Sequence, residues 1–138
     1  MNSIIPVNEE YTFEGRAIIS QTDLKGMITF TNRQFYNVSG YKAEELVGKS
    51  HNMVRHPDMP RAAFEQMWKT IQSGQTWNGL IKNLRKDGLY YWVETEILPI
   101  KNSDDEVTGY ISAGKAASRT NIQETAELYN KMLEAEEN

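Results

Sequence analysis

Two alternating segments joined by a tight turn dominate the second half of this sequence and limit what it can fold into. Residues 76–86 (TWNGLIKNLRK) and 89–101 (LYYWVETEILPIK) flank Asp87 and Gly88, a pair typical of β-hairpin turns. In the second segment one set of alternate side chains is drier than the other, and this set consists of Tyr91, Val93, Thr95 and Ile97. The pattern predicts antiparallel strands with one face turned toward a core.

The remaining strands and helices follow in an order that defines the fold class. Two short strands, 17–21 and 27–31, are joined by a turn, and short helical pieces fill the residues up to Gly48. A last strand follows the turn at 102–106 (NSDDE). We therefore predict an α+β domain with a five-stranded antiparallel sheet, whose short helices and one longer helix lie on one side.

The longer helix is predicted between Pro60 and Ser73. Its apolar residues fall at positions i, i+3, i+4 and i+7 and form one stripe, which consists of Phe64, Met67, Trp68 and Ile71. Asp58 is placed to cap the first turn of this helix, and Gly74 is placed to end it. We expect the stripe to be core rather than a ligand site.

The two ends of the chain are predicted to lie outside this domain. We expect an N-terminal tail over residues 1–16, a folded domain over 17–117 and a C-terminal helix over 118–138. The helix carries a narrow apolar seam beside acidic residues, made by Ile122, Ala126, Tyr129 and Leu133. Such a seam predicts a partner, which is another helix or another domain.

Charge and hydropathy exclude several kinds of partner. The net charge of −4 and the pI near 5.2 disfavour nucleic acid, because nucleic-acid affinity depends on clustered Lys and Arg. No apolar run is long enough to insert into a membrane, and the first residues lack the basic start and apolar core of a signal peptide. We therefore expect a cytoplasmic location.

The absence of cysteine restricts the chemistry further. It removes disulfides, thiolate metal sites, iron–sulfur clusters and thiol adducts, so any redox chemistry must belong to a bound cofactor. The sequence also has no glycine-rich phosphate loop and no pattern of a nucleophile with its base. We expect a protein that is not an enzyme.

The stretch SHNMVRHPDMPRAAF, residues 50–64, places charged side chains around two prolines directly before the apolar helix. Arg55 offers a forked guanidinium for phosphate oxygens, and the helix N-terminus adds backbone N–H groups. His56 can donate to a phosphate or stack on a ring, and Asp58 can orient Arg55. The alternative is a structured loop in which Asp58 caps the helix and pairs with Arg55. His51, His56 and Asp58 fit no standard metal-binding spacing, so no metal site is expected.

Two segments, NMVRHPDMPRAAFEQMW (52–68) and GQTWNGLIKNLRKDGLYYWV (74–93), closely resemble the PAS domains of bacterial aerotaxis and energy-taxis receptors. The predicted order of strands and helices is also the PAS order, so the resemblance covers residues 17–117. It implies a non-covalently bound FAD, in preference to FMN or haem, that reports redox, oxygen or energy status to the chemotaxis machinery. The implied partners are a chemotaxis receptor or signalling domain, contacted through the sheet face and the C-terminal helix, and a second copy of the chain in a homodimer.

Matched position by position, the resemblance implies a set of flavin-binding residues, which are Arg55, His56, Asp58, Trp77, Asn83, Asn32 and Tyr110. The indole of Trp77 can stack on a flat ring, although core packing is the alternative. The amide of Asn83 can both donate and accept, so it can rotate when reduction turns the flavin N5 from acceptor to donor. This rotation would bias the last strand and the terminal helix between two packed states. The alternative is a solvent-facing asparagine with no role.

Other functions remain open on the sequence alone. A PAS cavity can hold haem through an axial histidine, which would have to be His56, although this residue precedes the helix. A PAS fold without a ligand could serve as a dimerisation or docking module through Trp92 and the seam between Ile122 and Leu133. Receptors of this family continue into membrane and signalling segments. We therefore expect this chain to be either a fragment or a stand-alone PAS protein that acts through a separate receptor.

Overall fold

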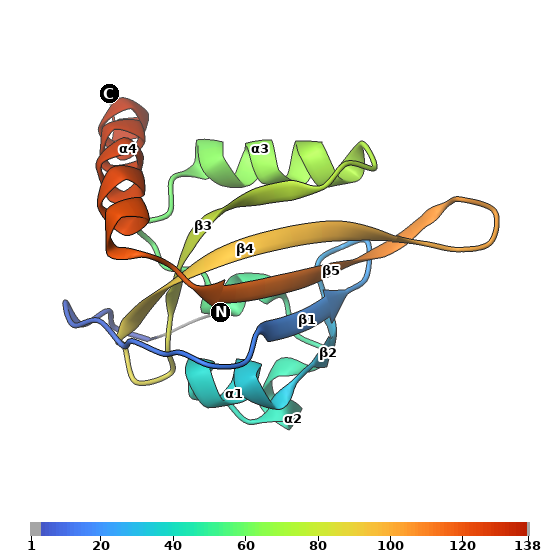
Figure 1. Ribbon diagram of the computed structural model, residues 1–138, viewed down its shortest axis with the longest axis horizontal. Coiled ribbons are helices and arrows are strands. Elements are labelled where there is room, and N and C mark those ends of the chain that lie inside the picture. Colours follow the sequence, from blue (N-terminus) through green and yellow to red (C-terminus); the bar gives the residue numbers. More distant parts are fainter. Residues whose placement is uncertain (1–3, 138) are drawn as a thin grey trace.

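The computed structural model describes residues 4–137 and contains one antiparallel sheet with helices packed on it (Figure 1). The strands are β1 (Ile18–Thr22), β2 (Ile28–Thr31), β3 (Trp77–Leu84), β4 (Tyr90–Lys101) and β5 (Val107–Ala116). Their order across the sheet is β2-β1-β5-β4-β3, so β2 and β3 form its two edges. The predicted α+β class and five-stranded antiparallel sheet are confirmed.

The helices follow the predicted order. They are α1 (Arg33–Ser39), α2 (Ala43–Leu46), the 3₁₀ turn η1 (His51–Val54), α3 (Arg61–Gln72) and α4 (Arg119–Glu137). Both α1 and α3 pack on the face of β4 that carries Val93 and Ile97. Figure 1 shows α4 standing across the end of the domain, beside the start of α3.

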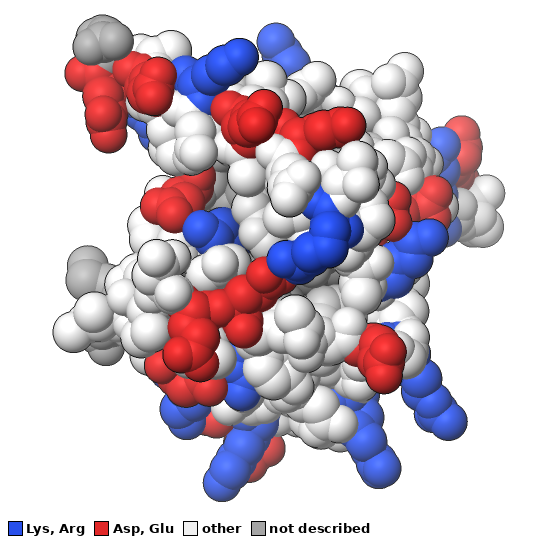
Figure 2. Space-filling view, turned by 60° about the vertical axis from the view of Figure 1, so that its left-hand side comes forward, with Lys and Arg blue, Asp and Glu red and all other residues white. Residues whose placement is uncertain are grey.

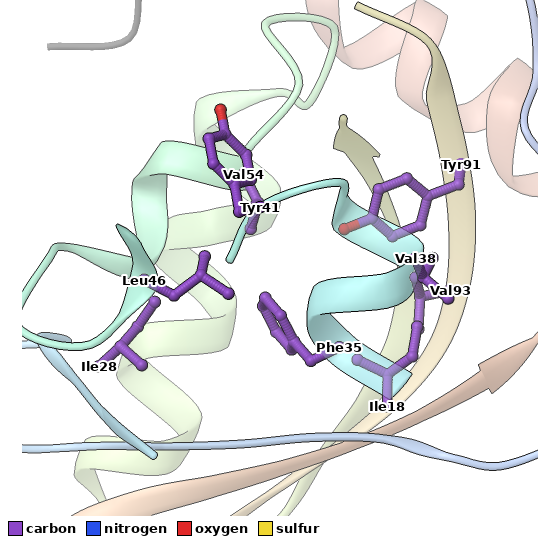
Figure 3. Close-up of a cluster of buried hydrophobic side chains, with 9 residues drawn as sticks. All are labelled: Ile18, Ile28, Phe35, Val38, Tyr41, Leu46, Val54, Tyr91 and Val93. Atoms are coloured by element: carbon purple, nitrogen blue, oxygen red, sulfur yellow. The ribbon is translucent and has the colours of Figure 1, made fainter. Parts of the chain in front are cut away.

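The core cluster between α1 and the strands fixes one end of this inner face (Figure 3). Phe35 and Val38 project from α1 toward the strand side chains, and all members of the cluster are at least nine-tenths buried. The members are Ile18, Ile28, Phe35, Val38, Tyr41, Leu46, Val54, Tyr91 and Val93. The dry set of β4 predicted by alternation therefore does face the core.

The turn between β1 and β2 shows how local chemistry sets the start of the sheet. The carboxylate of Asp23 accepts the backbone N–H groups of Lys25 and Met27, each at 2.9 Å. Gly26 has φ +83°, a left-handed conformation that side chains rarely adopt, and a Cβ there would lie 3.1 Å from the Trp68 ring. The turn therefore needs both its aspartate and its glycine.

The start of α3 differs from the prediction that Asp58 caps it. The N-cap residue is Pro60, whose side chain cannot accept a hydrogen bond, and Asp58 instead pairs with Lys82 at 2.9 Å. The N–H groups of Arg61 and Ala62 donate to the carboxylate of Glu136 at 3.1 and 2.9 Å. Asp58 lies two residues before the cap position, so a carboxylate from α4 takes the capping role.

The apolar seam of α4 finds its partners within this chain. Ile122 and Tyr129 are buried in one cluster with Met59, Ala63, Leu80 and Trp92, and the rings of Trp92 and Tyr129 stack at a centroid distance of 6.2 Å. Trp92 is only 7% exposed as a result. The seam therefore packs on the β3–β4 end of the sheet and on the start of α3, rather than on another domain.

The outward edge of β3 is covered by two segments. The hydroxyl of Tyr129 donates to the carbonyl of Leu80 at 2.7 Å, and the N–H of His56 donates to the carbonyl of Lys82 at 3.3 Å. The N–H of Lys82 points at the sulfur of Met59, 3.3 Å away. An edge strand exposes unpaired backbone groups, and here α4 and the loop before α3 satisfy several of them.

The segment before β1 runs along the turn of the β3–β4 hairpin. The N–H of Val7 donates to the carbonyl of Gly88 at 2.8 Å, and the N–H of Tyr11 donates to that of Tyr90 at 2.7 Å. Between them, the carboxylate of Glu10 forms an ion pair with Arg119 at the start of α4. The N-terminal segment and the start of α4 therefore meet at the same corner of the sheet.

His56 is a buried part of the loop that covers β3. It is 4% exposed, its ring packs edge-on against Tyr90, and its Nδ1 accepts the N–H of Asp58 at 3.0 Å. Burial lowers the pKa of His56, the neighbouring Lys82 lowers it further, and Asp58 opposes both. The imidazole is therefore neutral at pH 7, with its proton on Nε2.

We expect Tyr129→Phe to lower the free energy of unfolding by about 1–3 kcal/mol, because the buried carbonyl of Leu80 loses its donor. Stacking on Trp92 is retained in this variant. Urea denaturation measures the change, and Tyr36→Phe is the matched control because the Tyr36 hydroxyl has no partner within residues 4–137. Equal losses in the two variants would contradict the role given to the Tyr129 hydroxyl.

We expect the stability of the fold to decrease as the pH falls below about 6.5, the unperturbed histidine pKa. The folded state lowers the pKa of His56, so the unfolded chain binds the proton more tightly and gains from acidification. NMR titration of the two histidine rings, assigned with the variant His51→Gln, measures this pKa directly. A His56 pKa at or above 6.5 would show that the ring is not held neutral.

Candidate functional site

A cavity lies between the inner face of the sheet and α3. Its walls are largely apolar and come from α1, α3 and four strands, through Ile18, Phe35, Phe64, Met67, Trp68, Ile71, Ile81, Val93, Ile97 and Tyr110. The enclosed volume is about 80 Å³, well below the roughly 300–1,000 Å³ of pockets that hold drug-sized ligands. A larger ligand therefore requires the half-buried side chains of α3, Phe64 and Trp68, to move outward.

Polar groups interrupt these apolar walls at defined places. They are Ser20 and Thr22 on β1, His51 and Asn52 on η1, Asn83 on β3, Thr95 on β4 and Ser112 on β5. A concave apolar site with a few polar groups is the usual form of a small-molecule site, because the polar groups fix the orientation of the ligand. The arrangement suits a flat, mostly apolar ring with hydrogen-bonding atoms at its edge.

Asn83 lines the cavity from β3 and is tied to two neighbouring segments. It faces Tyr91 across the β3–β4 ladder, and its backbone forms a bridge with Arg55. The side chain of Asn83 hydrogen-bonds the hydroxyl of Tyr91, whose pKa is raised by burial. An amide in this position can exchange a bond to Tyr91 for a bond to a ligand.

His51 and Ser20 form a buried polar pair in the cavity wall. The Ser20 Oγ and His51 Nε2 atoms lie 3.0 Å apart, and the imidazole packs edge-on against Phe35 at a centroid distance of 5.6 Å. Burial lowers the pKa of His51, so the ring is neutral at pH 7. A neutral ring can donate from one nitrogen and accept at the other.

Arg55 lies where the cavity reaches the surface. Its guanidinium donates to the carbonyl of Met59 at 3.2 Å and lies 4.1 Å from the centroid of the Phe64 ring. Burial lowers the pKa of Arg55, and Glu136 opposes this change. The group stays charged and points along the rim of the cavity.

Of the residues predicted from the sequence, Arg55, Asn83 and Tyr110 line the cavity together. Trp77 lies beside it, in the cluster of Met67, Ile71, Ile97 and Tyr110. Its indole covers Gly79 so closely that a Cβ at this glycine would lie 2.5 Å from the ring. The indole therefore packs on its own strand at the end of the cavity.

The other three predicted residues do not line the cavity. Asn32 is the N-cap of α1, where its Oδ1 accepts the N–H groups of Phe35 and Ile19 and its amide donates to Ala17. His56 is buried in the loop along β3, and Asp58 is 59% exposed and paired with Lys82. All three hold the segments that surround the cavity.

Sequence reasoning missed several residues of this site. Ser20, His51, Thr95 and Ser112 were not predicted, and the apolar stripe of α3 is cavity wall as well as core. Alternation within β1 contains the missing signal, because it puts the small polar residues Ser20 and Thr22 on the same face as the buried Ile18. No local pattern marks His51, since its contact with Ser20 joins residues 31 positions apart.

Other kinds of site find no support in the part of the chain that the structure describes. No three His, Asp or Glu residues among 4–137 are grouped as metal ligands, and no helix there could cross a membrane. On the face in Figure 2, basic and acidic side chains are interspersed instead of forming one basic surface.

Comparison with known proteins identifies the family. The family model described as the PAS fold matches residues 28–113. The chain is 44% identical over 115 residues to the aerotaxis receptor of Escherichia coli K12, covering 83% of this chain and 22% of the receptor. It is 31% identical over 94 residues to a nitrogen fixation regulatory protein of Klebsiella pneumoniae, covering 68% of this chain and 19% of that protein. The chain thus spans about a fifth of the length of these relatives.

Solved structures agree with the family assignment. The dark structure of the blue-light photoreceptor Aureochrome1 LOV superimposes with a TM-score of 0.70 at 19% identity, covering 86% of each chain. A PAS domain from Colwellia psychrerythraea superimposes with a TM-score of 0.63 at 27% identity, covering 75% of this chain and 87% of that one. This chain belongs to the PAS family, and the predicted resemblance is confirmed.

Proposed function

We propose that this chain is a cytoplasmic PAS sensor domain that binds FAD non-covalently in the cavity between α3 and the sheet. It would sense redox, oxygen or energy status and pass it to chemotaxis signalling. The observation that carries the proposal is the cavity itself, which is lined by largely apolar side chains and by the amide of Asn83. The 44% identity to an aerotaxis receptor supports the taxis context.

The residues of the cavity suit a flavin chemically. Phe35, Met67 and Trp68 offer apolar surface to the flat ring, and the amide and hydroxyl groups of Asn83, Thr95 and Ser112 suit its polar edges. Of the proposed flavin-binding residues, Arg55, Asn83 and Tyr110 would contact the cofactor, and Trp77 would close one end of the slot. Asn32, His56 and Asp58 would act by holding α1 and the loop before α3 in place.

A bound flavin supplies reversible redox chemistry, and its N5 atom changes from acceptor to donor on reduction. The Asn83 side chain would answer by rotating, at the expense of its bond to Tyr91. Asn83 lies three residues from Leu80, whose carbonyl accepts the Tyr129 hydroxyl of α4. A shift of β3 would therefore change how α4 docks, and α4 would be the output of a sensor that is not an enzyme.

The proposal extends to organisation and partners. Residues 17–117 would form the sensory domain, with a tail before it at 1–16 and a signalling helix after it at 118–138. The sheet face and α4 would contact a chemotaxis receptor or signalling domain, and the chain would act as a homodimer. In this arrangement Trp92 and the seam cover each other, so they would become contact residues for a partner only if α4 undocked.

The alternative with haem loses the ligand proposed for it. His56 does not line the cavity. An axial ligand has to direct a free ring nitrogen at the iron. The geometry therefore favours a flavin over a haem held by His56.

We expect the purified protein to show the two absorption bands of an oxidised flavin and to release FAD on heating. The cavity-filling variant Ser112→Phe should lose the chromophore, because Ser112 lines the slot. Ala113→Phe is the matched control, since the neighbouring side chain points to the opposite face of β5. Absorption spectra and mass spectrometry of the released cofactor test this, with circular dichroism to confirm folding. A colourless wild type that takes up no added flavin would contradict the proposal.

We expect Asn83→Ala to retain flavin but to lose the effect of reduction on α4. Hydrogen exchange of the α4 amides, compared between oxidised and reduced protein, should change in the wild type and stay constant in the variant. Asn78→Ala, on the exposed face of β3, is the matched control and should behave like the wild type. A reduction-dependent change in Asn83→Ala equal to that of the wild type would rule out this route.

A further inference from the structure

The hydroxyl of Thr31 is the one buried side-chain polar atom within residues 4–137 that has no hydrogen-bond partner. Thr31 is the last residue of β2 and is 8% exposed. A buried hydroxyl without a partner destabilises a fold, so each such group in a native protein requires an explanation. The surroundings of Thr31 supply one, because it lies next to the polar pair of Ser20 and His51.

Thr31 and Ser20 lie directly opposite each other in the β1–β2 ladder. The N–H of Asn32 donates to the carbonyl of Ile19 beside this pair, which makes it a non-hydrogen-bonded pair, the kind whose side chains approach most closely. Residues that lie opposite each other in this way also share one face of the sheet. A small side-chain rotation therefore brings the two hydroxyls within hydrogen-bonding reach.

The hydroxyl of Ser20 is bound to His51 instead. Its Oγ lies 3.0 Å from Nε2 of the ring. A hydrogen bond from the ring to the backbone of His51 itself holds the proton of the neutral imidazole on Nδ1, so Nε2 accepts from Ser20. A second proton on Nε2 would turn this nitrogen into a donor, and Ser20 would then need another acceptor. Thr31 Oγ1 is a free acceptor in the adjacent position.

Few charges lie near His51. Its N–H donates to the carbonyl of Gly26 at 2.9 Å, and the carboxylate of Asp23 in the same turn is held by two backbone N–H groups. Arg55 carries the one permanent charge among the described side chains that line the cavity. Tyr110 also lines it, and burial raises the pKa of this phenol. His51 is therefore the side chain of the cavity wall that can gain a charge near pH 7.

We propose that His51, Ser20 and Thr31 form a proton-binding site that takes up one proton when negative charge enters the cavity. The inference rests on the proposed flavin function, in which an external electron donor reduces the bound cofactor. A proton from solvent adds to Nε2 of His51, and the Ser20 hydroxyl turns its hydrogen from Nε2 to Thr31 Oγ1. The imidazolium balances one added negative charge, and the Thr31 hydroxyl gains its missing partner.

NMR titration of the His51 ring in flavin-loaded protein, before and after reduction with dithionite, tests this site. The oxidised protein should contain a neutral ring at pH 7, with its proton on Nδ1. Reduction should raise the proton affinity of His51 by on the order of tenfold or more and produce the nitrogen chemical shifts of an imidazolium. The variant His51→Gln identifies the signals of this ring.

The variant Thr31→Val keeps the shape of the side chain and removes the acceptor. It should lower the proton affinity of His51 by on the order of tenfold, the effect of one hydrogen bond, in flavin-loaded and flavin-free protein alike. Thr31→Ser retains a hydroxyl and should restore the wild-type affinity. Thr29→Val, at an exposed position of β2, is the matched control and should have no effect. A purely structural Thr31 hydroxyl predicts a different result, in which Thr31→Val changes stability and leaves the pKa of His51 as it was.

The outcomes separate this inference from the proposed function. A His51 ring that stays neutral on reduction, or a His51 pKa that is equal in the wild type and Thr31→Val, would overturn the proton site while leaving flavin binding in place. A wild type that takes up no flavin would overturn the proposed function. The comparison of Thr31→Val with Thr29→Val in the flavin-free chain would then still decide whether the three residues bind a proton together.

Discussion

The free edge of β3 is the constraint on which the rest of this structure depends. β3 is an edge strand, so the backbone N–H and C=O groups on its outer side have no partner in β4. Where this edge is buried, water cannot satisfy these groups either. Two segments hydrogen-bond these groups. The loop before α3 does so through the backbone of His56 and the sulfur of Met59, and α4 does so through the hydroxyl of Tyr129. Covering one edge therefore fixes where α3 starts and where α4 docks on the sheet.

This solution brings the cavity and the C-terminal helix to the same strand. Asn83 faces inward to the cavity, Lys82 binds the loop, and the carbonyl of Leu80 holds α4. A change at the inner face of β3 can thus reach α4 along the short stretch of backbone from Asn83 to Leu80, without passing through the core of the domain. The capping of α3 by Glu136 adds a second contact between the wall of the cavity and the same helix.

Much of the fold could be predicted because its signals are local. Alternation in β4 and the turn at Asp87 and Gly88 predicted the β3–β4 hairpin. The helical spacing of Met67 and Ile71 predicted α3 and its buried face. The placement of the candidate site residues was less evident from the sequence. Arg55, Asn83 and Tyr110 share one cavity, whereas the side chains of His56 and Asn32 lie outside it and hydrogen-bond the backbone. A histidine or asparagine in a loop looks the same in sequence whether it binds a ligand or the backbone.

The sequence by itself determined the order of strands and helices, the inner and outer faces of the hairpin, and the lack of any thiol chemistry. These follow from periodicity and composition, which act over a few residues or over the whole chain. Only the tertiary structure decided that Glu136 caps α3, that the seam of α4 covers Trp92, and that Ser20 meets His51 inside the cavity. The reason is that hydrogen bonds between distant segments depend on how the helices settle on the sheet, and no local pattern encodes that packing.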